Sequence, residues 1–203
     1  MDLAGIRESV TASLDDTHRA REAGLRTCRT IIRSAANSIR SFHRGELEAA
    51  AALVQEAGRM LAETTALLSD HPDILHAGFV HDAAKEYAEA VLTAALAAGG
   101  PLPTPADLGV LVPAYLNGLG EAVGALRRRM LDLLRAGDLE AAAATLDTMD
   151  AVVEALATLD YPDGMTGGLR RTTDVARALV ERSRSDLTTT FVQERLRRSL
   201  ERG

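Results

Sequence analysis

Apolar residues recur every three or four positions along most of this chain, and this helical spacing limits its fold more than any other feature. Two such stripes run through Leu119, Val123, Leu126, Met130 and Leu133, and through Leu146, Met149, Val153 and Leu156. Apolar and polar residues do not alternate between turn signals, as they would in a half-buried strand. We therefore predict an all-α protein.

The composition supports the same prediction. Apolar residues make up 46% of the 203 residues but aromatic residues only 3%, so the core must be filled mainly by Leu, Ala, Val, Ile and Met, most of which favour helices. We expect one multi-helix bundle over residues 1–203, with long helices at 2–43, 46–69, 72–98, 105–136, 138–159 and 166–200. Because a mean globular helix has about 11 to 12 residues, helices of this length favour self-association into a homo-oligomer.

Several classes of protein are excluded by single residue types. Lys85 is the only lysine and lies outside any glycine-rich turn, so there is no GxxxxGK[ST] phosphate-binding loop. Cys28 is the only cysteine, which excludes an internal disulfide and a cysteine zinc cluster. No apolar run approaches the roughly 20 residues of a membrane span, so we expect a cytoplasmic protein without a membrane partner.

Basic residues are concentrated between Arg19 and Arg44, where seven arginines accompany one acid, Glu22. On a helix, six of them fall within an arc of roughly 80°, opposite the apolar side chains of the same segment. These six are Arg19, Arg26, Arg29, Arg33, Arg40 and Arg44. The segment therefore predicts one helix with a basic face and an apolar face.

This basic face is about 37 Å long at 1.5 Å per residue, which suits an extended polyanion better than a small ligand. Arginine binds phosphate through two parallel hydrogen bonds, so the face favours RNA or single-stranded DNA. The alternative is a solvated face that pairs with acids of a neighbouring helix.

Acidic residues gather on a later helix. Asp82, Glu86 and Glu89 stand at i, i+4 and i+7 and share one face of the helix. Their mutual repulsion destabilises the helix unless a cation lies between them. Glu121, on the polar side of the next helix with Asn117, Ala125, Arg128 and Asp132, can complete a cluster across the two helices. Carboxylates suit Mg²⁺ or Mn²⁺, although Lys85 or an arginine can supply the positive charge instead.

Five histidines show no zinc-binding spacing. His76 and His81 lie close in sequence to the acidic face, so contact with a nucleic-acid substrate is expected of them.

Together these segments resemble the translin family, in particular its prokaryotic members and translin-associated factor X. The matching pieces are His43-Arg44-Gly45-Glu46, Gly78-Phe79 with Asp82-Ala83, Lys85-Glu86-Tyr87-Ala88-Glu89-Ala90, Tyr115-Leu116-Asn117-Gly118-Leu119, Gly137-Asp138, Asp160-Tyr161-Pro162-Asp163, Gly168-Leu169-Arg170-Arg171 and Arg184-Ser185-Asp186-Leu187. Their order and spacing cover roughly residues 29–187.

The resemblance implies an all-α bundle that assembles into a larger shell, often octameric, which holds single-stranded RNA or DNA against its inner surface. It also implies a Mg²⁺-dependent endoribonuclease site, made of a Glu-x-x-Glu pair and two acids one turn apart on a later helix. The pair corresponds to Glu86 and Glu89, and the first later acid to Glu121, where the family more often has aspartate. The second position is Ala125, which departs from the family.

The leading hypothesis is a homo-oligomeric endoribonuclease of the translin type. Glu86, Glu89 and Glu121 are the predicted catalytic and metal-binding residues, with Mg²⁺ or Mn²⁺ as cofactor. The predicted nucleic-acid contacts are Arg26, Arg29, Arg33, Arg40, Arg44, His76 and His81. One alternative is a protein that binds single-stranded RNA or DNA without cleaving it, and another is a helical scaffold that uses these faces for assembly.

Overall fold

A computed structural model of the chain describes residues 3–201, and within this range it consists of helices and short connections. The helices are α1 (Leu3–His43), α2 (Leu47–Leu67), α3 (Pro72–Leu75), α4 (Gly78–Ala98), α5 (Pro105–Leu108), α6 (Val112–Ala136), α7 (Leu139–Ala157), α8 (Asp163–Thr166) and α9 (Leu169–Leu200). The all-α prediction is confirmed. Within the same range, no helix combines the length and the apolar character that a membrane span requires.

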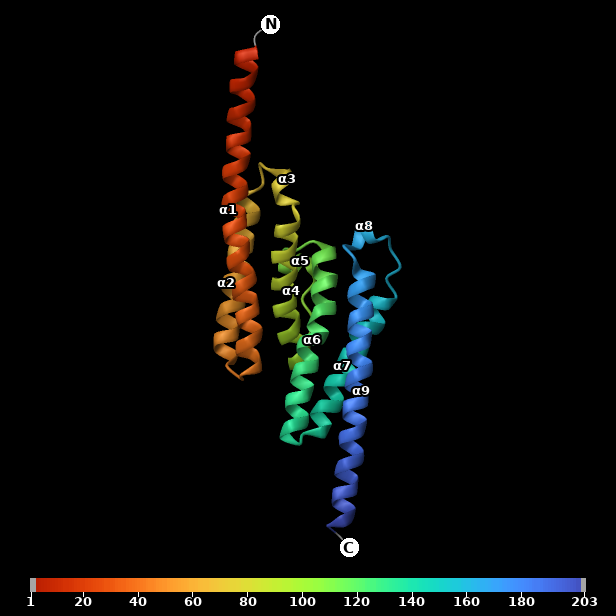
Figure 1. Cartoon of the computed structure of the whole chain (residues 1–203). Helices are drawn as coiled ribbons and strands as arrows, with labels where there is room; N and C mark the ends of the chain where they lie inside the picture. Colours follow the sequence, from red (N-terminus) through yellow and green to blue (C-terminus); the bar gives the residue numbers. More distant parts are fainter. Residues whose placement is uncertain (1–2, 202–203) are drawn as a thin grey trace.

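The six long helices form an elongated bundle (Figure 1). α1 and α2 make a hairpin along one side, α4 and α6 run in the same direction through the middle, and α7 and α9 cover the other side. The N-terminal part of α1 and the C-terminal part of α9 project beyond the bundle at opposite ends.

Two apolar cores hold the bundle together. One contains Cys28 and Ile31 of α1 with Leu61 of α2, and the other contains side chains of α6, α7 and α9, including Met130 and Met149. α4 contributes to both, because its first half packs into the former core and its second half into the latter. Because α4 packs into both cores, its acidic face lies in the middle of the bundle.

The connections explain where the helices end. Gly137 ends α6 with a φ of 81°, which glycine adopts without strain, and the Asp138 side chain accepts the N–H of Ala141 at the start of α7. Gly45 likewise turns the chain between α1 and α2 with a φ of 77°. Both breaks were predicted from the sequence.

Three predicted boundaries differ from the structure. Residues 72–98 and 105–136, each expected as one helix, are each divided into a single turn and a longer helix. Ala77 and Leu111 separate the two parts in extended conformations, with ψ of 151° and 147°. The last expected helix, 166–200, begins at Leu169 because Gly167 and Gly168 take φ of 62° and 84°.

Candidate metal centre and nucleic-acid interface

Three glutamates converge where α4 crosses α6. Glu86 and Glu89 come from α4 and Glu121 from α6, and one carboxylate oxygen of each lies within 4.8 Å of the others. The crossing is close because of Gly118, where an added Cβ would lie 2.8 Å from the Lys85 carbonyl oxygen and 2.9 Å from the Glu89 nitrogen. We call these three residues the carboxylate cluster.

Lys85 contributes a cation to this cluster. Its Nζ donates to both oxygens of Glu121 at 2.6 Å and lies 3.3 Å from Oε1 of Glu86. Burial acts to lower the pKa of Lys85, but these ion pairs outweigh it and raise the pKa above its ordinary value. The positive charge that the sequence allowed from Lys85 is therefore present, and it is directed mainly at Glu121.

Glu89 is in a different situation. Among residues 3–201 no basic side chain lies within the 4.0 Å that defines an ion pair with its carboxylate. Burial, together with the charges of Glu86 and Glu121, raises the pKa of Glu89 from 4.5 to about 7, and Lys85 offsets this only in part. Ionising Glu89 near neutral pH therefore leaves a mostly buried negative charge that a further cation would stabilise.

A buried hydroxyl oxygen on α4 lacks a hydrogen-bond partner within the described residues. Thr93 lies one turn beyond Glu89 on α4, and its buried hydroxyl has no hydrogen bond within the described part of the chain. Ala125, one turn beyond Glu121, is only 8% exposed, so it belongs to the buried layer rather than to the polar side of α6 where we expected it. Asn117 is likewise buried.

Asn117 links α6 to the start of α9. Its Nδ2 donates to the carbonyl oxygens of Pro113 and Thr166, and its Oδ1 accepts from the Thr172 hydroxyl at 2.6 Å. A buried amide with all these bonds fixes the turn at Gly167 and Gly168 against α6. The first turn of α9 therefore stays beside the carboxylate cluster.

A hollow of about 500 Å³ opens between α4, α6 and this turn. Its charged and polar lining includes Glu121 of the carboxylate cluster and its partner Lys85, with His81, Asp82, Arg171 and Thr172. Arg171 is exposed and makes no ion pair within residues 3–201. The hollow thus offers a guanidinium and an imidazole next to the carboxylates, an arrangement suited to holding a phosphodiester against a metal.

The arginines of α1 lie on the outside of the bundle. Arg26, Arg29 and Arg33 are exposed and have no acidic partner among the described residues. Arg40 donates to Asn37, and Arg44 binds Glu46 through Nε and Nη2 at 2.8 and 2.7 Å. Arg19 pairs with Asp16 on the same helix at 3.2 Å. Within the described residues, Arg19 and Arg44 are therefore the members of the basic face that pair with an acid, and the rest of the face is open.

These arginines and the carboxylate cluster are not brought together. The buried face of α1, which includes Cys28 and Ile31, packs on α2 and α4, and the basic face is on the opposite side of the helix. No hydrogen bond or ion pair joins the two groups in the described chain. The structure therefore keeps the basic face of α1 and the carboxylate cluster apart.

His76 and His81 share a second hollow of about 620 Å³ near the start of α4. Its remaining lining is mostly apolar, with Leu61, Val80 and Val110. His81 borders both hollows, whereas His76 borders only this one. Of the two histidines, His81 is therefore the one next to the carboxylate cluster.

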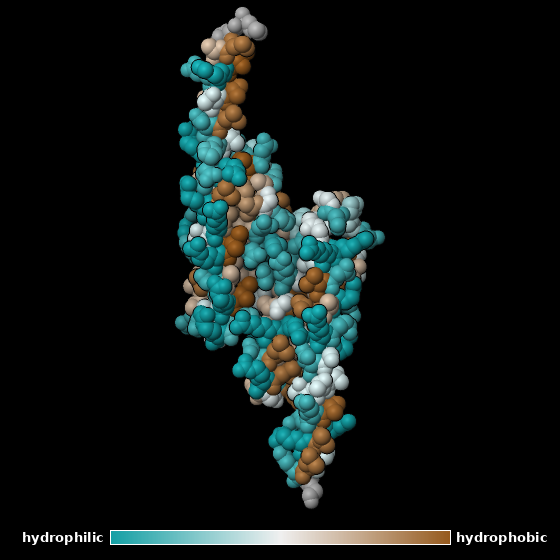
Figure 2. Space-filling view, in the orientation of Figure 1, coloured by the Kyte–Doolittle hydropathy of each residue, from teal (hydrophilic) through white to brown (hydrophobic). Residues whose placement is uncertain are grey.

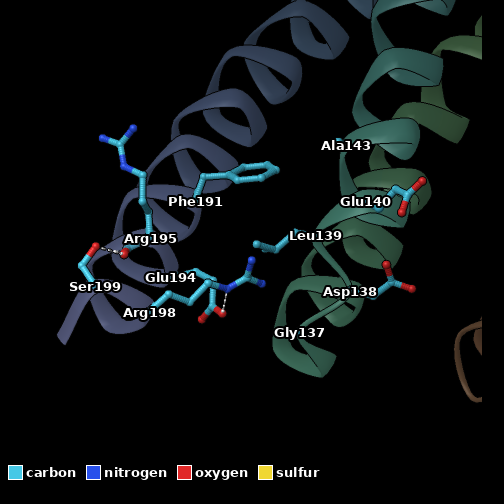
Figure 3. Close-up of a pocket in the computed structure, with 10 residues that line it drawn as sticks. All are labelled: Gly137, Asp138, Leu139, Glu140, Ala143, Phe191, Glu194, Arg195, Arg198 and Ser199. Carbon is cyan, nitrogen blue, oxygen red and sulfur yellow. Dashed lines mark hydrogen bonds and ion pairs between the residues drawn. The ribbon is translucent and has the colours of Figure 1, made fainter. Parts of the chain in front are cut away.

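A third hollow, of about 820 Å³, lies between the α6–α7 turn and the end of α9 (Figure 3). Two of its three acids are engaged, because Asp138 caps α7 and Glu194 binds Arg197 and Arg198 at 2.8 Å, which leaves Glu140 as a single carboxylate. This hollow has no converging free carboxylates and is not a candidate metal site.

Comparison with known proteins identifies the family. No family model matches the chain. An uncharacterized protein of Methanocaldococcus jannaschii is 24% identical over 184 residues, which are 90% of this chain and 81% of that protein. AfC3PO, solved in complex with duplex RNA, is 32% identical with a TM-score of 0.84, and the match covers 95% of this chain and 98% of that one. The chain belongs to the translin family.

Other translin-family structures agree with this result. A second AfC3PO structure is 31% identical with the same TM-score of 0.84, covering 95% of this chain and 98% of that one. The apo-NeC3PO structure is 17% identical with a TM-score of 0.80, covering 90% and 96%, and shares the fold. The translin resemblance predicted from the sequence motifs is thereby confirmed.

Sequence reasoning missed two residues of the site. Arg171 was noted only as part of a family segment, since nothing in one sequence indicates that it lies beside residues 81–85. Gly118, which sets the helix crossing, was noted in the same way. A glycine in the middle of a helix, where it costs about 1 kcal/mol relative to alanine, was the available signal of a close contact.

Proposed function

We propose that this translin-family protein is an RNA-binding, metal-dependent endoribonuclease whose active centre is the carboxylate cluster. The observation that carries the proposal is the convergence of Glu86, Glu89 and Glu121 within 4.8 Å, with Glu89 lacking a cation of its own. AfC3PO, which has been solved with duplex RNA, supports RNA as the ligand.

The donor set fits a hard divalent cation, because Mg²⁺ and Mn²⁺ prefer carboxylate oxygens and retain several waters. Glu86, Glu89 and Glu121 would hold the metal. The metal, when bound, supplies activation of a water and neutralisation of charge at the phosphate.

The remaining chemistry comes from the side chains of this chain. Arg171 binds and orients the phosphodiester in the 500 Å³ hollow, and Lys85 holds Glu121 toward the cluster through its two 2.6 Å contacts. The arginines of α1 bind the more distant strand through phosphates, so recognition is largely independent of sequence.

A nuclease assay tests the proposal. Labelled single-stranded RNA is incubated with the wild type, Glu86→Gln or the control Glu48→Gln, an exposed glutamate of α2, in Mg²⁺, Mn²⁺ or EDTA. We expect cleavage by the wild type and Glu48→Gln in either metal only, and none by Glu86→Gln. Binding of RNA by all three proteins, without any cleavage in either metal, would refute the catalytic proposal.

The second candidate is a translin-type binding protein without catalysis. The observation that favours it is the Lys85–Glu121 contact, because an ammonium already neutralises one of the three proposed ligands. Mn²⁺ titration of wild type and Lys85→Met separates the candidates. A metal site gains affinity when the competing cation is removed, whereas a purely structural pair gives no metal binding in either protein.

A further inference from the structure

The hollow that His76 and His81 share has the size of a small-molecule site. Its volume of about 620 Å³ falls within the range of roughly 300–1,000 Å³ that such sites occupy. Part of its lining consists of buried apolar side chains from three helices, Leu61 of α2, Val80 of α4 and Ala114 of α6. A flat apolar group that displaces water from these side chains would be bound favourably.

Glycines border much of this hollow. Gly78, Gly109 and Gly164 line it and are exposed, and apart from their own chain segments no described atom lies within 4 Å of a Cβ built at any of them. Their peptide groups are therefore accessible to a ligand. Figure 2 shows mainly neutral and hydrophilic surface over α8 and the start of α9, in contrast to the apolar projecting ends of α1 and α9. The hollow is thus an apolar site in polar surroundings.

His81 and Gly167 connect this hollow to the candidate metal centre. Both residues line the 620 Å³ hollow and also the 500 Å³ hollow that contains Glu121 and Arg171. Nε2 of His81 lies 3.6 Å from the position of a Cβ at Gly167, so the imidazole stands where the two hollows meet. His81 precedes Lys85 by one helical turn, or about 6 Å along α4. The sugar that joins a phosphate to its base can span this separation.

The two histidines add flat polar rings to a mostly apolar lining. Neither His76 nor His81 makes an ion pair or a side-chain hydrogen bond within the described chain. Proteins hold an unstacked base by stacking it on a ring, histidine included, and by hydrogen bonds to its edges. A neutral imidazole offers one donor and one acceptor for those edges. Both kinds of contact with a base are therefore available in this hollow.

We propose that the 620 Å³ hollow binds an unstacked purine base of the RNA strand, next to the phosphate held beside the carboxylate cluster. This inference rests on the proposed function, because it assigns a base site to the same strand. A purine is favoured over a pyrimidine because its larger ring system buries more apolar area against Leu61, Val80 and Ala114. The hollow thus adds a base preference to the phosphate contacts of α1, which carry no sequence information.

Fluorescence anisotropy in EDTA tests the site without cleavage. End-labelled oligouridylate, with or without one central adenosine, is titrated with wild type, Thr65→Phe or Ala52→Phe. Thr65 is exposed on α2 and lines the hollow, so phenylalanine there occupies part of it, whereas Ala52 is exposed on the same helix and does not line it. Circular dichroism verifies that both variants fold.

We expect the wild type and Ala52→Phe to bind the adenosine RNA several-fold more tightly than the uridine RNA. Thr65→Phe should bind the two RNAs equally, because its new ring takes the place of the base. Equal affinities of the wild type for the two RNAs, or an undiminished preference in Thr65→Phe, overturns the proposal.

Substitution of His81 tests the contribution of the ring. His81→Ala should lose the preference for adenosine, and His81→Phe, which keeps a flat ring for stacking, should retain part of it. A preference that survives unchanged in His81→Ala would show that the ring does not hold the base, and the proposed site would then be wrong.

The cleavage pattern separates this inference from the proposed nuclease function. In Mg²⁺, cuts by the wild type should concentrate at the phosphates next to the single adenosine. Absence of cleavage, with the adenosine preference in EDTA preserved, refutes the nuclease and supports the base site. Uniform cleavage along the strand, without any adenosine preference in binding, supports the nuclease and refutes the base site.

Discussion

Replacing Glu89 with glutamine tests the electrostatics of the cluster without changing its shape. The raised pKa means that the folded, metal-free protein binds a proton at Glu89 more tightly than the unfolded chain does. The resulting stability is fully present below pH 4.5 and is lost as the pH rises to about 7. Glutamine is neutral at every pH and cannot incur this loss.

The size of the effect follows from the two pKa values. A rise from 4.5 to about 7 corresponds to about 3 kcal/mol of unfolding free energy. Glu89→Gln should therefore match the wild type near pH 4.5, become progressively more stable than it up to pH 7, and keep an advantage of about 3 kcal/mol at pH 8.

Urea unfolding followed by circular dichroism measures this advantage. Wild type, Glu89→Gln and the exposed control Glu48→Gln are compared from pH 5 to pH 8.5 in EDTA at one protein concentration. Only Glu89→Gln should show a difference that grows with pH. Adding Mg²⁺ at pH 8 should then stabilise the wild type and reduce its deficit, because a ligand that binds only the folded state stabilises it.

Two results would refute this reasoning. Glu89→Gln that is less stable than the wild type by the same amount at all pH values would show that the carboxylate acts through a neutral hydrogen bond. If Mg²⁺ and Mn²⁺ leave the unfolding free energy of the wild type unchanged at pH 8, Glu89 does not bind a metal.

Three further predictions concern the crossing, the basic face and the missing acid. Gly118→Ala should destabilise the protein by about 1–3 kcal/mol and abolish metal-dependent cleavage, because the new Cβ forces α4 and α6 apart. Gly124→Ala is the control that should be tolerated in urea unfolding and cleavage assays, since the nearest atom to its added Cβ lies 3.8 Å away. Replacing Arg29, Arg33 and Arg40 with glutamine should weaken RNA binding and flatten its dependence on salt. Fluorescence anisotropy measures both, and unchanged values would show that the basic face does not bind RNA. Ala125→Glu should lower stability in EDTA because position 125 is buried, and should lower the Mg²⁺ concentration needed for cleavage. An unchanged metal titration, or one that Glu121→Gln does not reverse, would count against Glu121 as a ligand.

Helical periodicity was enough to predict the class of fold. The breaks at Gly45 and Gly137 could be predicted as well, because a glycine between two periodic segments is the residue that most readily adopts the positive φ at which a helix ends. The break before α6 also has a signal in the sequence, namely Gly109 and Pro113, but the expected helix ran through both residues. In the structure Gly109 takes a φ of 63° and Pro113 lies near the start of α6. The break at Ala77 has a weaker signal, because neither His76 nor Ala77 opposes a helix and only Gly78 follows.

The candidate site could be predicted only in part, because helical spacing fixes neighbours on one helix and not across two. Glu86 and Glu89 follow from their separation of three residues. Their approach to Glu121 depends on the register between α4 and α6, which Gly118 sets through contacts with the α4 backbone. The choice of Lys85 rather than an arginine as the cation depends on the same register.

The membership of α4 in two cores has a consequence for cooperativity. Val80 and Ala84 are covered by the side of the bundle that contains α1 and α2, while Ala88 and Leu92 are covered by α6, α7 and α9. Separation of either side would expose half of this helix and loosen the other half, so the two sides are expected to unfold together. Hydrogen exchange should therefore be slowest in the middle of α4, which places Glu86 on the part of the backbone that opens only when the whole bundle does.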